Sequence, residues 1–139
     1  MTWWMYAVAS ALAASATAIL AKIGVKDVPS NLATAIRTAV VLVFAWGIVF
    51  ATREQQGLPT LKGRSVLFLV LSGIGTGVSW LAYFKALQMA PASRVAPIDK
   101  LSLAFTVVLA AVVLKETITW KVWIGAALMV AGALLTLDT

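Results

Sequence analysis

Five stretches of about twenty mostly apolar residues occupy nearly the whole chain, and only short polar segments join them. A helix needs roughly 20 apolar residues to cross the hydrocarbon core of a bilayer. We therefore predict an all-α integral membrane protein, a bundle of five transmembrane helices whose backbone groups are paired within each helix. The predicted spans are residues 3–22, 31–50, 65–88, 93–114 and 119–137. No soluble domain fits between them, so we expect residues 1–139 to form a single domain.

The composition agrees with a membrane location and narrows the chemistry. Hydrophobic residues make up 62% of the chain and charged residues 12%, below the quarter that is typical of soluble domains. The sequence has no cysteine and no histidine, which excludes disulfides, thiol catalysis and imidazole chemistry within this chain. Its carboxylates form no metal-ligand or nucleophile–base pattern. We expect no cofactor, no metal and no enzymatic activity. The basic residues form no stripe, so we expect no nucleic acid partner.

Lysines and arginines near the ends of the spans bear on the orientation of the chain. On the N-terminal side they are Arg53, Lys62, Arg64, Lys115 and Lys121, and on the other side they are Lys22, Lys26, Lys85 and Arg94. This distribution favours a cytoplasmic N-terminus and an external C-terminus in a bacterial inner membrane. Because the two sides carry nearly equal numbers of basic residues, the sequence also permits insertion of the chain in both orientations. Two copies would then be able to pair as an antiparallel homodimer of inverted repeats.

Asp99 and Lys100 stand side by side in an otherwise apolar stretch. Adjacent helical side chains point about 100° apart, so we expect each to need a partner of its own. The 14 residues between Lys100 and Lys115 would rise only about 21 Å, which is less than the ~30 Å hydrocarbon core. We therefore predict that Asp99 and Lys100 lie inside the membrane. The alternative is a helix that begins at Pro97, with Asp99 in its first turn and Lys100 snorkelling to water.

The same length argument applies to Arg37, which only 15 residues separate from Arg53. These residues rise about 22 Å, so we expect Arg37 to lie below the membrane surface. An interfacial Arg37 that snorkels is the alternative. We expect Arg37, Lys85, Asp99 and Lys100 to fall in one layer, because all four lie toward the same side of the membrane. Our preferred pair is Asp99 with Arg37. The remaining positive charge would suit an anionic or zwitterionic solute.

Hydroxyl and aromatic residues form stripes that run toward this layer. They are Ser72, Thr76, Ser79, Trp80 and Tyr83 on the third span, Ser102 and Thr106 on the fourth, and Thr34 and Thr38 on the second. Because they recur at helical spacing, we predict that they line a polar cavity. For any single serine or threonine, the alternative is a hydrogen bond to its own helix. For Trp80 there are two alternative interpretations, namely contact with a substrate and packing in the core.

The segment from Tyr83 to Leu135 resembles the second half of an EamA domain, the repeat of the drug/metabolite transporter superfamily. It contains an aromatic–x–Ala-Leu end of the third span, then "APAS", then Glu116, then a small-residue pattern from Ile124 to Gly132. The resemblance implies ten helices in two inverted five-helix repeats and transport of metabolites or drugs by alternating access. It also implies that Glu116 stabilises a turn. This chain has one repeat, so we expect it to need a second copy or another partner.

The leading hypothesis is a transporter of a small metabolite that acts as a homodimer in the lipid bilayer. The alternatives are a flippase for lipid carriers and a non-transporting membrane subunit of a larger complex. The expected substrate-binding residues are Arg37, Lys85, Asp99, Lys100, Tyr83, Trp80, Ser79, Thr76 and Ser102. We assign structural roles to Glu116, Pro97, Gly73 and Gly77. The two glycines have GxxxG spacing, which permits close backbone approach or flexing.

Overall fold

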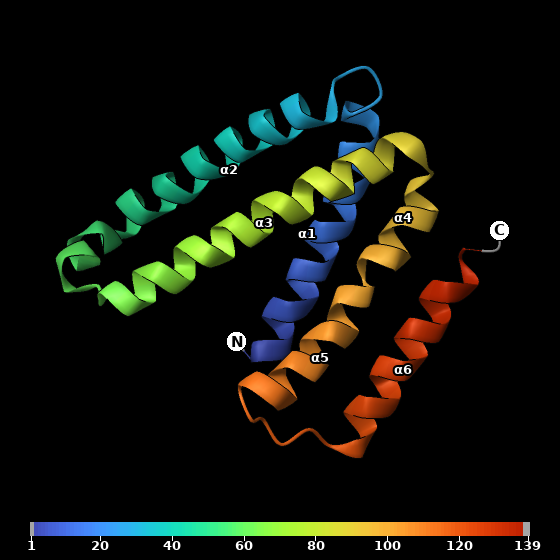
Figure 1. Cartoon of the computed structure of the whole chain (residues 1–139). Helices are drawn as coiled ribbons and strands as arrows, with labels where there is room; N and C mark the ends of the chain where they lie inside the picture. Colours follow the sequence, from blue (N-terminus) through green and yellow to red (C-terminus); the bar gives the residue numbers. More distant parts are fainter. Residues whose placement is uncertain (1, 138–139) are drawn as a thin grey trace. The chain divides into compact units, whose positions relative to one another are not determined.

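The computed structural model of the chain describes residues 2–137. Its helices are α1 (Trp3–Gly24), α2 (Ser30–Thr52), the 3-10 helix η1 (Glu54–Thr60), α3 (Gly63–Met89), α4 (Ala92–Asp99), α5 (Leu101–Val113) and α6 (Trp120–Leu135) (Figure 1). The described residues contain no strand, and the predicted all-α class is confirmed. Four stretches are long and apolar enough to cross a bilayer, namely α1, α2, α3 and the α4–α5 pair.

The last helix is shorter than its predicted span. The 16 residues of α6 rise about 24 Å, whereas the sequence predicts a helix over residues 119–137. Thr119 has an extended backbone, with φ −70° and ψ 152°, and therefore precedes the helix as its N-cap residue. At the other end the N–H of Thr136 bonds the carbonyl of Ala133, three residues back, so the helix tightens into a turn.

The chain forms two compact units. One unit runs from Ala21 to Gln88 and contains the end of α1 together with α2, η1 and α3. In it α2 and α3 form an antiparallel hairpin joined through η1 (Figure 1). The other unit combines Met1–Leu20 with Met89–Thr139. In this second unit α6 packs along α5 and also contacts α4.

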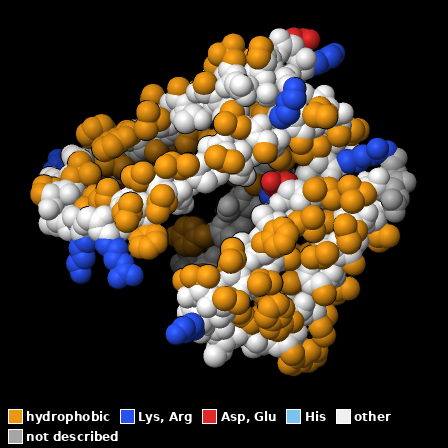
Figure 2. Space-filling view, in the orientation of Figure 1, with side chains coloured by type: hydrophobic (Ala, Val, Ile, Leu, Met, Phe, Trp, Pro, Cys, Tyr) orange, Lys and Arg blue, Asp and Glu red, His pale blue; other side chains and the backbone are white. Residues whose placement is uncertain are grey.

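Few side chains are buried within the described chain. Leu87 is 0% exposed, Val25 1% and Phe84 3%, and all three belong to the unit from Ala21 to Gln88. Most large apolar side chains are exposed instead, and Figure 2 shows hydrophobic atoms spread over the visible face of the helices. Such a surface suits a lipid solvent, in which apolar side chains can face outward and backbone groups are satisfied inside each helix.

The fourth predicted span, residues 93–114, corresponds to one apolar stretch, Ala92–Val113, whose helix is interrupted at Lys100. Pro97 lies inside α4 rather than at a helix start, which overturns the alternative of a helix that begins at Pro97. Proline has no N–H and removes one hydrogen bond from the helix. The N–H of Lys100 is shared between the carbonyls of Ala96 (3.2 Å) and Pro97 (3.1 Å), and the N–H of Leu103 bonds the Lys100 carbonyl at 3.0 Å. The span therefore consists of two helical pieces.

Two basic residues end helices in the left-handed conformation. Arg53 has φ 61° and follows α2, and Lys115 has φ 56° and follows α5. After Lys115 the backbone N–H of Glu116 turns back to the carbonyl of Ala110 at 3.2 Å. The Ala110 carbonyl also accepts the N–H of Leu114 at 3.2 Å, so two backbone donors converge on it at the end of α5. The turn at Glu116 thus depends on a backbone hydrogen bond.

Candidate substrate-binding site

Arg37 lies within α2 and points its guanidinium at α3. It is the eighth residue of α2, about 10 Å along the axis from the first. Its Cζ atom is 4.1 Å from the ring centroid of Trp80 and 5.6 Å from that of Phe84. Trp80 and Phe84 are one helical turn apart on α3, so both rings face the same way. Arg37 and Trp80 are half-buried and Phe84 is buried.

The electrostatics of this cluster favour a retained positive charge. An aromatic face attracts a cation, and the attraction reaches about 2 kcal/mol when the pair is shielded from water. A cation–π contact does not pair the guanidinium with an oxygen acceptor, and the group carries five N–H donors that a solute oxygen can engage. Within residues 21–88 no carboxylate pairs with Arg37. We refer to Arg37, Trp80 and Phe84 as the arginine–aromatic cluster.

Tyr83 extends the arginine–aromatic cluster. Its ring lies edge-on to that of Phe84, with centroids 6.5 Å apart and an interplanar angle of 87°. Lys85 belongs to the same turn of α3, but it follows Phe84 by one residue and is exposed. A step of one residue turns the side chain by about 100°, so Lys85 points away from the face that Phe84 shares with Trp80. The structure therefore brings Arg37, Trp80 and Tyr83 together and leaves Lys85 apart.

The threonines of the polar stripes bond to their own helices. The hydroxyl of each donates to the carbonyl four residues earlier: Thr34 to Ser30 (2.9 Å), Thr38 to Thr34 (2.8 Å), Thr76 to Ser72 (3.0 Å) and Thr106 to Ser102 (2.8 Å). These bonds are the ones that the alternative interpretation of the sequence expects for a single threonine. Ser79 on α3 and Ser102 on α5 have exposed side chains. The lining of a polar cavity by these stripes stays a prediction.

Asp99 and Lys100 satisfy each other, contrary to the expectation from helical geometry. The Nζ atom of Lys100 lies 3.2 Å from Oδ2 of Asp99. The expectation assumed an unbroken helix, whereas α4 ends at Asp99 and the flexible lysine stem reaches back across the break. The side chains are 55% exposed for Lys100 and 33% for Asp99. The preferred pair of Asp99 with Arg37 joins residues of different units and stays a prediction.

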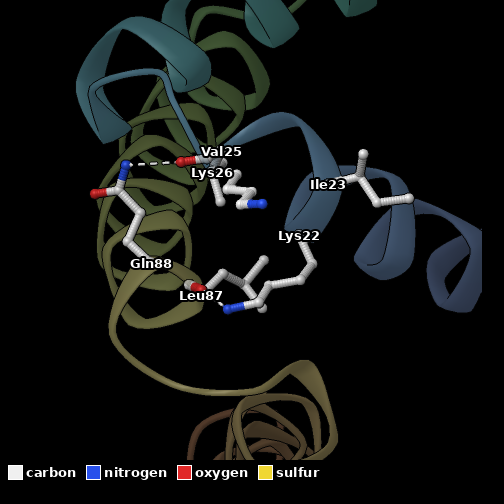
Figure 3. A pocket seen from close by; sticks show the side chains of 6 residues that line it. All are labelled: Lys22, Ile23, Val25, Lys26, Leu87 and Gln88. Atoms are coloured by element: carbon white, nitrogen blue, oxygen red, sulfur yellow. Dashed lines mark hydrogen bonds between the residues drawn. The ribbon is translucent and has the colours of Figure 1, made fainter.

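The sequence analysis missed a set of contacts at the end of the α2–α3 hairpin. The ammonium of Lys22 donates to the backbone carbonyl of Leu87. The amide nitrogen of Gln88 donates to the carbonyl of Val25 at 3.1 Å (Figure 3) and to the carbonyl of Val28 at 2.7 Å. Gln88 is a polar residue at the last turn of an apolar span, and that position was the available signal. These contacts fasten the α1–α2 connector to α3.

The glycine pair on α3 faces open space. A Cβ atom added at Gly73 or Gly77 would meet no atom within 4 Å. The close backbone approach that GxxxG spacing permits is therefore not made within the described residues. Close approach of a partner chain to the backbone at these two glycines stays a prediction.

Taken with its exposed apolar surface, this arrangement defines a multi-pass helical membrane protein that keeps an arginine inside one of its spans. The chain matches the EamA-like transporter family over residues 1–138 and belongs to that family. The predicted resemblance to the drug/metabolite transporter superfamily is thereby confirmed. The chain is also similar to a protein of Sinorhizobium sp. named "Uncharacterized transporter in cobO 3'region", with 46% identity over 134 residues.

That match covers 96% of this chain and 95% of the Sinorhizobium protein, so the two have similar lengths. No solved structure matches the chain. The family and the name of the relative identify a membrane transporter and point away from an enzyme. Contact with the lipid bilayer follows from the apolar spans.

Proposed function

We propose that the protein moves a small anionic or zwitterionic metabolite across a bacterial inner membrane by alternating access. The observation that carries this proposal is the guanidinium of Arg37, stacked 4.1 Å from the Trp80 ring centroid inside the hairpin of α2 and α3. A charged side chain within a membrane span is costly and usually marks a substrate or ion pathway. Trp80 offsets part of that cost and holds the guanidinium in one orientation.

The hydrogen-bond donors of the Arg37 guanidinium indicate the class of substrate. Arginine presents a planar fork of donors that matches the two oxygens of a carboxylate or phosphate. The rings of Trp80 and Phe84 both come from α3, so the sides of the guanidinium that face away from α3 remain for a solute. An amino acid or a small organic acid would supply the carboxylate, and its binding would neutralise the charge of Arg37. Substrate entry then lowers the electrostatic cost of the site.

The working unit in this proposal is a homodimer. The family membership and the resemblance described above imply two five-helix repeats, whereas this chain supplies one. The open face at Gly73 and Gly77 and the many exposed apolar side chains offer surface for a second copy. The even distribution of basic residues supports an antiparallel arrangement, in which the two copies face opposite sides of the membrane.

The substrate class is tested by thermal unfolding of the purified protein with anionic, zwitterionic and cationic metabolites. We expect carboxylates to raise the unfolding midpoint of the wild type and to have no effect on Arg37→Gln. Arg64→Gln is the matched control, because Arg64 also lies over an aromatic ring, 5.8 Å from the centroid of Phe68. It should respond like the wild type. Stabilisation by cations alone would overturn the proposed substrate class.

Transport itself is tested by solute flux into proteoliposomes, with Arg37→Ala and Asp99→Asn as variants. We expect Arg37→Ala to abolish flux and leave assembly intact. If both variants disrupt a larger assembly and the wild type carries no flux, the protein is instead a non-transporting subunit.

The orientation is tested separately with reporter tags on both termini. Two populations of molecules, one with each orientation, are expected of an antiparallel homodimer. A single orientation with a cytoplasmic N-terminus would exclude the antiparallel form and leave a parallel one.

A further inference from the structure

A second cationic feature lies apart from the arginine–aromatic cluster, in a hollow near the ends of α1 and α3. The hollow has a volume of about 530 Å³. It is lined by Lys22, Ile23, Val25, Lys26, Leu87 and Gln88. Figure 3 shows the side-chain nitrogens of Lys22 and Lys26 in the space between the last turn of α1 and the last turn of α3. A volume of this size is in the range that small-molecule sites occupy, roughly 300–1,000 Å³.

Among the described residues, the lining of the hollow contains two lysines and no carboxylate. Lys22 and Lys26 are its ionisable residues, and the other side chains are apolar apart from the Gln88 amide. The hydrogen bond from Lys22 to the Leu87 carbonyl holds the ammonium at the wall of the hollow. Asp27 follows Lys26 in the chain but does not line the hollow. Two lysines in one lining without a carboxylate favour an anion.

The connector that carries Lys26 is held in place on both sides. The Gln88 amide bonds the carbonyl of Val25, just before Lys26, and that of Val28, two residues after it. Val25 itself is 1% exposed. A connector tied at both points loses little further conformational freedom when Lys26 engages a ligand, so binding costs less.

The hollow lies where the spans end. Lys22 precedes the end of α1 by two residues, and Gln88 precedes the end of α3 by one. Span ends meet the headgroup region of a bilayer, where acidic lipids present phosphate oxygens. Lysine binds phosphate as a compact point charge with several donors.

We propose that this hollow binds a phosphate oxyanion through Lys22 and Lys26. The same chemistry is supplied by the headgroup of an acidic phospholipid and by a soluble phosphate ester. The site is distinct from Arg37 and does not depend on the class of solute that is transported.

Thermal unfolding of the full chain in a neutral detergent tests the site. The probes are phosphatidylglycerol, glycerol 3-phosphate and inorganic phosphate. We expect at least one of them to raise the unfolding midpoint of the wild type in a saturable manner. An effect of phosphatidylglycerol alone assigns the site to lipid headgroups. Saturation by glycerol 3-phosphate or inorganic phosphate assigns it to soluble phosphates. A wild type that none of the three stabilises would overturn the proposal.

Variants locate the effect in the hollow. The double variant Lys22→Gln/Lys26→Gln should bind the active probe about tenfold more weakly, whereas Lys22→Arg/Lys26→Arg should retain most of the affinity. Lys26→Gln alone is included because it should fold normally: Lys26 is exposed, and no hydrogen bond or ion pair holds its side chain within the described residues. It should also weaken binding of the active probe. Lys62→Gln/Lys121→Gln removes the same charge from residues outside the hollow and should bind like the wild type. Equal loss in this control pair would show that the probe senses net charge only.

Discussion

At the scale of single residues, the main finding is that Arg37 is stabilised by rings within residues 21–88. A guanidinium over an aromatic face keeps its charge and its N–H donors, whereas a salt bridge would occupy those donors. Length arithmetic on the sequence placed Arg37 inside a span. The sequence could not identify Trp80 as its neighbour, because spacing along one helix does not tell which helix faces it. Trp80 and Phe84 at a spacing of four residues were the signal that could have been used.

Trp80 should therefore affect both stability and solute affinity. We expect Trp80→Leu to lower the free energy of unfolding by about 1–2 kcal/mol, because it removes the cation–π contact while keeping an apolar side chain. Trp80→Phe should lose less. Trp46→Leu is the control, since Trp46 packs on Phe50 (centroids 5.6 Å apart) and contacts no cation among residues 2–137. Thermal unfolding and solute binding measure the two effects. Unchanged solute affinity in Trp80→Leu would contradict a role for the ring in the site.

Gln88 is the second residue whose contribution can be separated. Gln88→Leu keeps the size of the side chain and removes the donors to the carbonyls of Val25 and Val28. We expect a loss of about 1–3 kcal/mol in the free energy of unfolding, because two part-buried carbonyls lose their partner. Gln56→Leu, on the exposed surface of η1, should change stability little. Equal effects of the two substitutions in thermal unfolding would show that the Gln88 bonds contribute nothing.

At the scale of elements, the apolar stretches determine where the long helices lie and most of their ends. Lipid forces each long apolar stretch into a helix, so length alone predicts α1, α2 and α3 to within two residues at each end. The break at Lys100 was missed because a single proline inside a membrane helix is often tolerated without interruption. The early end of α6 at Leu135 and the helix η1 follow from local turn geometry, to which hydropathy is insensitive.

The turn after α5 offers a test at this scale. Lys115 has φ 56°, a conformation that costs a residue with a Cβ atom roughly 1–2 kcal/mol and costs glycine almost nothing. We expect Lys115→Gly to raise the free energy of unfolding by up to about 1 kcal/mol, and Lys115→Val to lower it because a branched Cβ fits this region worst. Thermal unfolding in detergent checks both signs. A loss of stability in the glycine variant would show that the lysine side chain itself stabilises the turn.

At the scale of the whole molecule, the chain leaves most of its large apolar side chains exposed. Some of this surface faces lipid, and the proposed second copy would cover another part. The described residues leave the Gly73–Gly77 face of α3 open. We expect Gly77→Leu to reduce the cross-linked dimer in membranes about tenfold, because a large side chain would hold the two backbones apart.

Gly47→Leu is the matched control for that experiment. Gly47 on α2 also has no atom within 4 Å of an added Cβ, so the substitution changes the same chemistry on another helix. It should leave the amount of dimer unchanged. A normal dimer in Gly77→Leu would move the interface to another face of the chain.

The hydrogen bonds of Lys22 on α1 with Leu87, and of Gln88 with the α1–α2 connector, give α3 a fixed point at one end. A tilt about Gln88 acts on a lever of 25 residues that reaches Gly63, about 37 Å away, whereas Trp80 lies only about 12 Å from the pivot. A rotation of about 10° would then carry Gly63 through roughly 6 Å and Trp80 through roughly 2 Å, at the helical rise per residue. The far end of the hairpin would swing while the arginine–aromatic cluster stayed nearly in place. A pivot of this kind suits an alternating-access cycle, in which a gate moves and the binding site is preserved.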